Sequence, residues 1–318
     1  MSNKWKIFWM VSFASVVLFQ SCGTWEELFI SLADEKKMGR EFDSLVRIND
    51  PQVINAAKKE KLFEPSGPQT EFWNYYQTRA MEIVRYIDDK DFKNLLPNSE
   101  KLCRNSITNS ITNAKDAVTC NKNNFFEFNI IESTQINAFA VPGGYVYFYT
   151  AILKKFESES ELMSVLGHEV GHVVRHHSRE RMLKSAAVNT LISVFLGDGI
   201  AGLIGLLGAN FWLLDNSQDN ESESDELGFY YTNKIGISSE GLSDFFGGGL
   251  ESYDPATGKC NEKKEGSLFD VFSTHPPSCE RVNNNTKRIK DSGQNPETHP
   301  KDRLIGGKKY NEVKSALP

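Results

Sequence analysis

The spacing of apolar residues divides the chain into stretches of different period. Between residues 72 and 87, apolar and aromatic side chains recur every three or four positions, which predicts an amphipathic helix. From Phe125 to Tyr149 the period is two, and a Pro-Gly-Gly break at 142–144 separates two runs of aromatic and β-branched residues. Such runs on both sides of a glycine pair predict strands joined by a tight turn, and therefore a small antiparallel sheet.

Helical spacing resumes after the predicted sheet. Acidic residues at 159–161 suit a helix N-terminus, and the predicted helix runs through Leu162, Val165, Leu166 and Val173 to about Lys184. Helical spacing returns after Glu221, through Leu227 and Tyr231. The fold class predicted from these periods is α+β and mainly helical, with the sheet as the smaller component.

The N-terminus has the pattern of a secretion signal. Two lysines precede an apolar run from Ile7 to Phe19, which is as long as a signal-peptide core and too short to span a membrane. Ser21 and Cys22 follow it, and a small residue before a cysteine resembles a bacterial lipoprotein cleavage site. We therefore expect a signal peptide over 1–21 and a lipidated Cys22. The alternative is an uncleaved or conventionally cleaved signal, in which this cysteine is incidental.

The remaining cysteines suit an oxidising compartment. They are even in number and fall into two pairs that are close in sequence, without the C-x-x-C spacing of a structural zinc site. Local pairing would give two disulfides, although crossed pairing and free thiols stay open. The expected pairs are Cys103 with Cys120, and Cys260 with Cys279.

The charge balance limits the classes of partner. The formal net charge of the chain is −6. A sequence-independent grip on nucleic acid needs a basic surface. We therefore expect no nucleic-acid partner.

The strongest chemical signal is His168-Glu169-Val170-Gly171-His172. Residues four apart on a helix project to the same side, so the two imidazoles can bind one ion. Glu169 is displaced by about 100° around the helix, and can face a water on that ion without binding the metal. The pattern predicts a metal site on the helix that begins at 159–161.

A third metal ligand lies further along the chain. A catalytic zinc site commonly has two histidines, one carboxylate and an open position. Glu221 is the candidate carboxylate, in an acidic run that would otherwise be a solvated surface. Asp225 lies about one turn later on the same helix face and can accept a hydrogen bond from the outer nitrogen of a ligating imidazole.

These motifs together resemble the HtpX-like and CAAX-prenyl-protease-like zinc metallopeptidases, the forty-eighth family of metallopeptidases. The resemblance covers about residues 70 to 285, and the motifs occur in the family's order. They are the strand and turn at 137–147, the paired histidines, an E-x-x-A-D motif with Ser224 in place of alanine, and Ser-Thr-His-Pro at 273–276 followed by Arg281. The resemblance implies a gluzincin-type domain that binds one Zn²⁺ per subunit through His168, His172 and Glu221.

The resemblance also implies roles for the other site residues. Glu169 would be the general base, and His275 would donate a hydrogen bond to the oxyanion or, alternatively, occupy the fourth zinc position and close the resting site. Arg281 would be a second donor or an orienting residue. An extended polypeptide would bind along the strand and turn, at Asn137, Ala138, Phe139, Ala140, Gly143 and Gly144. The alternative is that this strand is an ordinary internal strand that binds no substrate. We expect His176 and His177, which continue the metal helix, to be structural.

An apolar stretch at 186–214 separates the metal-binding motifs. A single membrane crossing is excluded, because His172 and Glu221 flank the stretch and must meet at one ion. A buried helical pair and a lid or membrane-resting flap both stay open. There is no run of transmembrane helices of the HtpX kind, so the closer resemblance is to a lipid-anchored envelope branch.

We therefore expect an enzyme of the bacterial envelope, anchored to the membrane by lipid and facing the periplasm. The predicted activity is zinc-dependent hydrolysis of misfolded or extended envelope proteins. A processing protease of narrow specificity and a non-catalytic, zinc-stabilised scaffold or chaperone are alternatives. The expected organisation is a signal peptide (1–21), an N-terminal helical segment (22–70), a metallopeptidase domain (71–290) and a polar C-terminal tail (291–318).

Overall fold

The computed structural model describes residues 32–50, 53–54, 60–95, 125–185, 216–247, 251–254, 257, 259–261, 275, 278–304 and 306–318. The predicted signal peptide with Cys22, the apolar stretch at 186–214, and the side chains of Cys103, Cys120 and Cys260 lie outside the described residues. Among the helices in these ranges, none combines the length and apolar character that crossing a bilayer requires.

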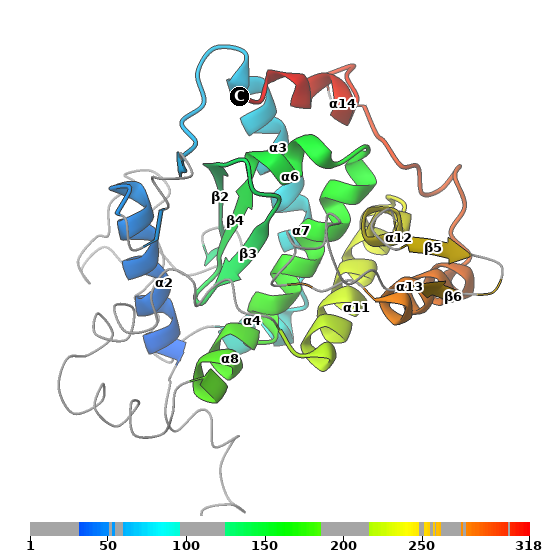
Figure 1. The fold of residues 1–318 in the computed structure, drawn as a ribbon, viewed down its shortest axis with the longest axis horizontal. Coiled ribbons are helices and arrows are strands. Elements are labelled where there is room, and N and C mark those ends of the chain that lie inside the picture. Colours follow the sequence, from blue (N-terminus) through cyan, green and yellow to red (C-terminus); the bar gives the residue numbers. More distant parts are fainter. Residues whose placement is uncertain are drawn as a thin grey trace, which may run out of the picture.

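Four strands form a sheet in the order β1-β2-β4-β3 (Figure 1). They are β1 (Lys61–Leu62), β2 (Glu127–Glu132), β3 (Ala138–Val141) and β4 (Tyr145–Tyr149). β3 and β4 form the predicted antiparallel hairpin, but β2 and β4 are parallel, so the sheet is mixed. β2 and β3 are consecutive in the sequence but are not neighbours in the sheet, because β4 lies between them. A period of two does not encode this order, because it says nothing about which strands are neighbours.

The sheet is buried on both faces. Along β4, Val146 and Phe148 belong to an apolar cluster shared with α3 (Gln69–Arg85) and α7 (Glu159–Val174). The alternate residues Tyr145, Tyr147 and Tyr149 belong to a second cluster, with α2 (Leu32–Arg47). Figure 1 accordingly shows α2 on one side of the sheet and the longer helices on the other. The metal helix predicted from the sequence is thus part of the core.

The predicted helix from 159 to 184 is two helices. α7 begins after Ser158, whose hydroxyl accepts the Glu161 N–H at 3.3 Å, and it ends at Val174. His176 then has a φ of 57°, in the left-handed region, and α8 (His177–Ser185) starts at the next residue. The prediction of one helix was wrong because residues 175–181 are all polar, so apolar spacing does not mark the turn.

α11 (Gln218–Ile235) crosses α7 at small residues. A Cβ built on Gly167 would lie 3.0 Å from the Gly228 Cα, and one on Gly171 would lie 3.0 Å from the Ser224 Cα. Side chains larger than these would keep the two helices apart. This close approach brings Glu221 of α11 beside the histidines of α7.

The remaining described elements surround these helices. They are α4 (Asp89–Leu95), α6 (Thr150–Lys155), α12 (Glu240–Gly247), β5 (Glu251–Asp254), β6 (Lys259–Asn261), α13 (Cys279–Ser292), α14 (Tyr310–Val313) and the 3₁₀ helix η6 (Lys314–Ala316). Cys279 is disulfide-bonded. The two expected pairings, and the division of the chain into segments, stay predictions.

The polar C-terminal segment packs on the domain and pairs with the first residue of α7. Glu159 is fully buried and forms ion pairs with Arg79 of α3 at 2.7 Å and with Arg303 at 2.6 Å. Tyr310 is also fully buried, and its ring lies 5.9 Å from that of Tyr75. Residues beyond 291 therefore pack on the domain, which their composition alone does not indicate.

We predict a graded response to substitutions at Gly171. Alanine favours a helix over glycine by about 1 kcal/mol, which offsets the cost of its Cβ against Ser224, so Gly171→Ala should change stability little. Gly171→Val should lower the free energy of unfolding by about 2–3 kcal/mol, because it forces the helices apart. Urea unfolding followed by circular dichroism measures both. A valine variant as stable as the wild type would contradict the close contact of α7 and α11.

Candidate metal centre

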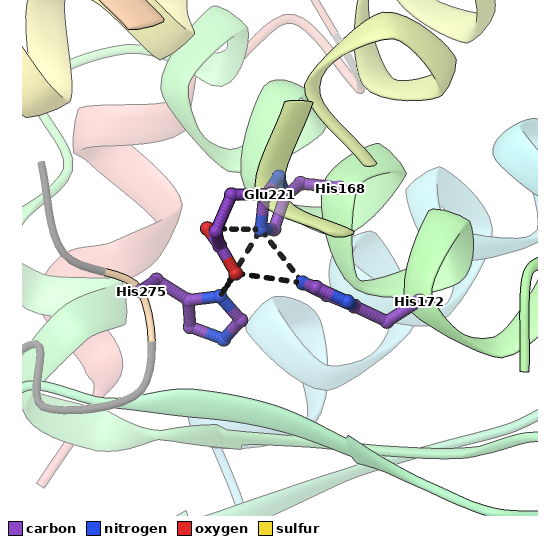
Figure 2. Close-up of side chains that lie close together, drawn as sticks. All are labelled: His168, His172, Glu221 and His275. Carbon is purple, nitrogen blue, oxygen red and sulfur yellow. Dashed lines mark hydrogen bonds and ion pairs between the residues drawn. The ribbon is translucent and has the colours of Figure 1, made fainter. Parts of the chain in front are cut away.

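Four buried side chains converge where α7 meets α11 (Figure 2). The Nε2 atoms of His168 and His172 are 3.0 Å apart. Nδ1 of His275 lies 3.1 Å from Nε2 of His168 and 2.9 Å from Oε1 of Glu221. The carboxylate of Glu221 lies 3.4 Å from Nε2 of His168 and 3.3 Å from Nε2 of His172.

These separations fit a tetrahedral zinc ion. Ligand atoms at about 2.1 Å from such a centre lie about 3.3 Å from one another. Three imidazole nitrogens and one carboxylate oxygen are ligands that zinc prefers. Ring nitrogens facing each other at 3.0 Å compete for a proton, and a cation placed between them removes that competition. The group can therefore hold a metal ion.

His275 lies within this group. Its Nδ1 takes the fourth place beside the three predicted ligands, and its Nε2 lies 3.2 Å from Oε1 of Glu169. An oxyanion donor would instead point at the substrate. Of the two alternatives raised by the sequence, this geometry favours the fourth ligand.

Asp225 and Arg281 contact the predicted ligands. Oδ1 of Asp225 lies 2.8 Å from Nδ1 of His168, which is the predicted contact with the outer nitrogen. Arg281 of α13 donates two hydrogen bonds of 2.7 Å to the Asp225 carboxylate, and its Nη1 lies 2.9 Å from Oε2 of Glu221. The guanidinium also lies 4.2 Å from the Phe246 ring. These contacts place Arg281 behind the ligands, which favours the orienting role over that of a second oxyanion donor.

The charges at the centre offset the cost of burial. Burial acts to raise the pKa of Glu221, but His275 and Arg281 outweigh it and hold that pKa well below its usual value. Burial also acts to raise the pKa of Asp225, and the Arg281 guanidinium produces a net lowering. For His168, burial acts to lower the pKa, but the neighbouring carboxylates raise it to about 9. Both carboxylates are therefore ionised, which is the form that binds a cation.

His177, which the sequence predicts to be structural and to continue the metal helix, begins a separate helix, α8, and lies beside the predicted ligand His172. In the structure its Nδ1 lies 2.8 Å from Nδ1 of His172, and its Nε2 lies 3.3 Å from Oε2 of Glu223. Burial lowers the pKa of His177 to about 4, with Glu223 opposing the shift. The adjacent His176 contacts Glu35 at 3.0 Å instead.

The predicted substrate strand, β3, is an edge strand of the described sheet. It pairs with β4 alone. The Tyr149 N–H donates to the Asn137 carbonyl at 3.0 Å. Because hydrogen-bonded positions alternate in an antiparallel pair, the backbone groups of Ala138 and Ala140 point away from β4. The Ser178 hydroxyl donates to the Ala140 carbonyl at 3.1 Å.

Other residues assigned to the substrate have packing roles. Phe139 belongs to the apolar cluster beside α2. Gly143 and Gly144 have φ values of 80° and 91°, and a Cβ on either would come within 2.8 Å of Lys36 Cα or the Phe125 carbonyl. A tight turn packed against Lys36 and Phe125 therefore accounts for both glycines.

A family model now places the chain among known proteins. The model described as peptidase family M48 matches residues 104–289. The chain belongs to this family. The resemblance found in the sequence is thereby confirmed, and so is the fold class, mainly helical with a small sheet. Metalloproteases of family M48 use zinc, in agreement with the donor set at the centre.

Curated relatives carry names of metalloproteases. The chain is 34% identical to the Beta-barrel assembly-enhancing protease of Yersinia pestis, over 38% of this chain and 27% of that protein. It is 30% identical to Metalloprotease YcaL of Escherichia coli strain K12, over 51% of this chain and 61% of the relative. It is 29% identical to Mitochondrial metalloendopeptidase OMA1 of Arabidopsis thaliana, over 49% and 30%. The chain thus spans less than two thirds of each of these relatives.

We predict that Glu221→Gln lowers zinc affinity. The amide that replaces the carboxylate is neutral and a poor zinc ligand, so the two histidines and His275 would hold the ion alone. Titration against a chromophoric chelator should show about a 100-fold loss of affinity, with an unchanged far-ultraviolet circular dichroism spectrum. Equal zinc affinity in the variant and the wild type would refute the assignment of Glu221 as a ligand.

Proposed function

We propose that this protein is a zinc-dependent endopeptidase that hydrolyses misfolded or extended proteins in the bacterial envelope. The observation that carries the proposal is the convergence of His168, His172 and Glu221 at one buried point, with Glu169 on the same helix. A site that only stabilised the fold would not need an acid at position 169. Membership of a family of metalloproteases supports the same class of reaction.

The zinc ion would be held by the two motif histidines and Glu221. When bound there, zinc polarises a scissile carbonyl and lowers the pKa of a coordinated water. Glu169 would take a proton from the attacking water and pass it to the leaving amine, as a general base does in this kind of hydrolysis. Its side chain is fully buried, and its carboxylate faces the His275 ring.

His275 would close the resting site. With Nδ1 among the ligands and Nε2 at Glu169, its ring stands between the base and the metal position. Substrate and water need the fourth position at the metal, so the His275 side chain would have to move away from it before hydrolysis. We propose this as the resting state of the enzyme.

Two residues would position the ligands. The Asp225 carboxylate lies 2.8 Å from the outer nitrogen of His168 and would fix the tautomer and ring plane of that imidazole. Arg281 would hold Asp225 and Glu221 in place through its three close contacts. We therefore assign both to positioning, and neither to contact with substrate.

Substrates would bind as an added strand at β3. The outward N–H groups of Ala138 and Ala140 and the outward Ala138 carbonyl provide backbone hydrogen bonds of the kind used in strand addition. Backbone recognition tolerates many side chains but requires an extended chain. This favours unfolded or misfolded polypeptides over folded ones, and a broad specificity over a single dedicated substrate.

The location rests on the N-terminal sequence and on the relatives. A lipidated Cys22 would anchor the protein to the membrane, facing the periplasm. The name of the Yersinia pestis relative refers to β-barrel assembly, which supports an envelope setting. The expected partners are therefore extended polypeptides and a membrane surface.

We predict that Glu169→Gln abolishes cleavage and retains zinc. Glutamine keeps the size of the side chain but cannot accept the proton, so casein hydrolysis should fall by about 10²–10⁴-fold. Zinc content, measured by atomic absorption, should equal that of the wild type. A non-catalytic scaffold would be indifferent to the change. Wild-type cleavage by the variant would exclude the general-base role.

We predict that His275→Ala raises the rate of casein hydrolysis several-fold. Removal of the ring opens the fourth position and leaves the other three ligands in place. His299→Ala is the matched control, since this histidine contacts Thr298 and Asn233 and should leave the rate unchanged. A His275→Ala enzyme with bound zinc and reduced activity would argue for oxyanion stabilisation instead.

A further inference from the structure

A second histidine supports the metal ligand His172 from behind. His177 is 2% exposed, and its Nδ1 lies 2.8 Å from Nδ1 of His172. On the other side of the ring, Nε2 lies 3.3 Å from the carboxylate of Glu223. The three side chains come from α7, α8 and α11 and form one line that leads from the metal centre to the protein surface.

The placement of protons along this line follows from the metal. If His172 gives its Nε2 lone pair to zinc, its proton must be on Nδ1. That N–H then donates to Nδ1 of His177, which must be unprotonated. The proton of His177 is therefore on Nε2, from which it donates to Glu223. One arrangement of protons satisfies both contacts.

We infer that His177 is a positioning residue that fixes the tautomer and ring plane of His172, as Asp225 does for His168. The inference rests on the proposed function, because it needs a metal on Nε2 of His172. Outer partners of this kind orient a ligand and raise its basicity. Here the partner is a neutral imidazole, with the carboxylate one step further out.

A local backbone conformation at His176 brings the His177 ring into contact with His172. His177 is five residues after His172, so on an unbroken helix it would be rotated away by about 140°. The left-handed conformation of His176 ends α7 and turns the chain so that the next ring points back. Such a conformation is unfavourable for a non-glycine residue and persists where the surroundings hold it. Here Glu35 does so, through contacts of 3.0 Å with His176 and with Arg179.

Ser224 also faces this line. It stands where the family motif has alanine, and its hydroxyl lies 3.2 Å from Nδ1 of His177. That nitrogen has one lone pair, and the closer His172 N–H at 2.8 Å takes it. The Ser224 hydroxyl is therefore a secondary contact, compatible with the tautomer of His177 that His172 requires.

The first test compares zinc affinities of full-length variants by chelator competition. His177→Leu removes the acceptor and should weaken zinc binding by about 10- to 100-fold, whereas His177→Asn, which keeps an acceptor oxygen, should recover part of the loss. The absorption spectrum of the Co²⁺-loaded protein should shift in the leucine variant, which a purely structural role would not cause. His299→Leu is the matched control, because this histidine contacts Thr298 and Asn233 and, among the described residues, none of the metal centre.

A second pair of variants keeps the inference testable if His177→Leu does not fold. Glu223 and Glu226 are both exposed on α11, and only the former contacts His177 among the described residues. Glu223→Ala should weaken zinc binding several-fold, whereas Glu226→Ala, which removes the same charge, should not. Wild-type zinc affinity in His177→Leu, or, if that variant does not fold, equal affinity in Glu223→Ala and Glu226→Ala, would overturn the inference. A wild-type protein that binds no zinc would overturn the proposed function itself, which separates the two failures.

Discussion

The close contact between α7 and α11 is the constraint on which the rest of the structure depends. Neither helix carries a complete site, because His168 and His172 are on α7 and Glu221 is on α11. Gly171 and Ser224 let the backbones approach so closely that the Glu221 side chain reaches both rings. The contact also buries two carboxylates, and Arg281 from α13 compensates for them. The crossing of α7 and α11 therefore determines both how the two helices pack and which buried charges must be compensated.

The sequence predicted which side chains lie together here because the motif on each helix is local. His168 and His172 share a helix face by periodicity alone, and the acidic motif supplied Glu221 and the neighbouring Asp225. The family resemblance added His275, with two possible roles between which only three-dimensional placement discriminates. The structure brings all five together in one buried group.

What the sequence did not predict depends on features that periodicity does not encode. The turn at His176 lies within the polar residues 175–181, so no apolar spacing there indicates that His177 points back at the metal helix. The position of β4 between β2 and β3 is a matter of strand order, and the alternation of residues is the same for either order. The packing of the C-terminal segment depends on a few residues, such as Arg303 and Tyr310, within a polar composition.

The ion pairs of Glu159 limit where the domain can be truncated. This residue opens the helix that carries the histidines, and its partners are Arg79 and Arg303. Both arginines lie outside residues 104–289, the part that matches the family. An expression fragment trimmed to that match would leave a buried carboxylate without its counter-charges at the foot of the metal helix. In this chain, the segment that matches the family is shorter than the set of residues that pairs the charges of the metal helix.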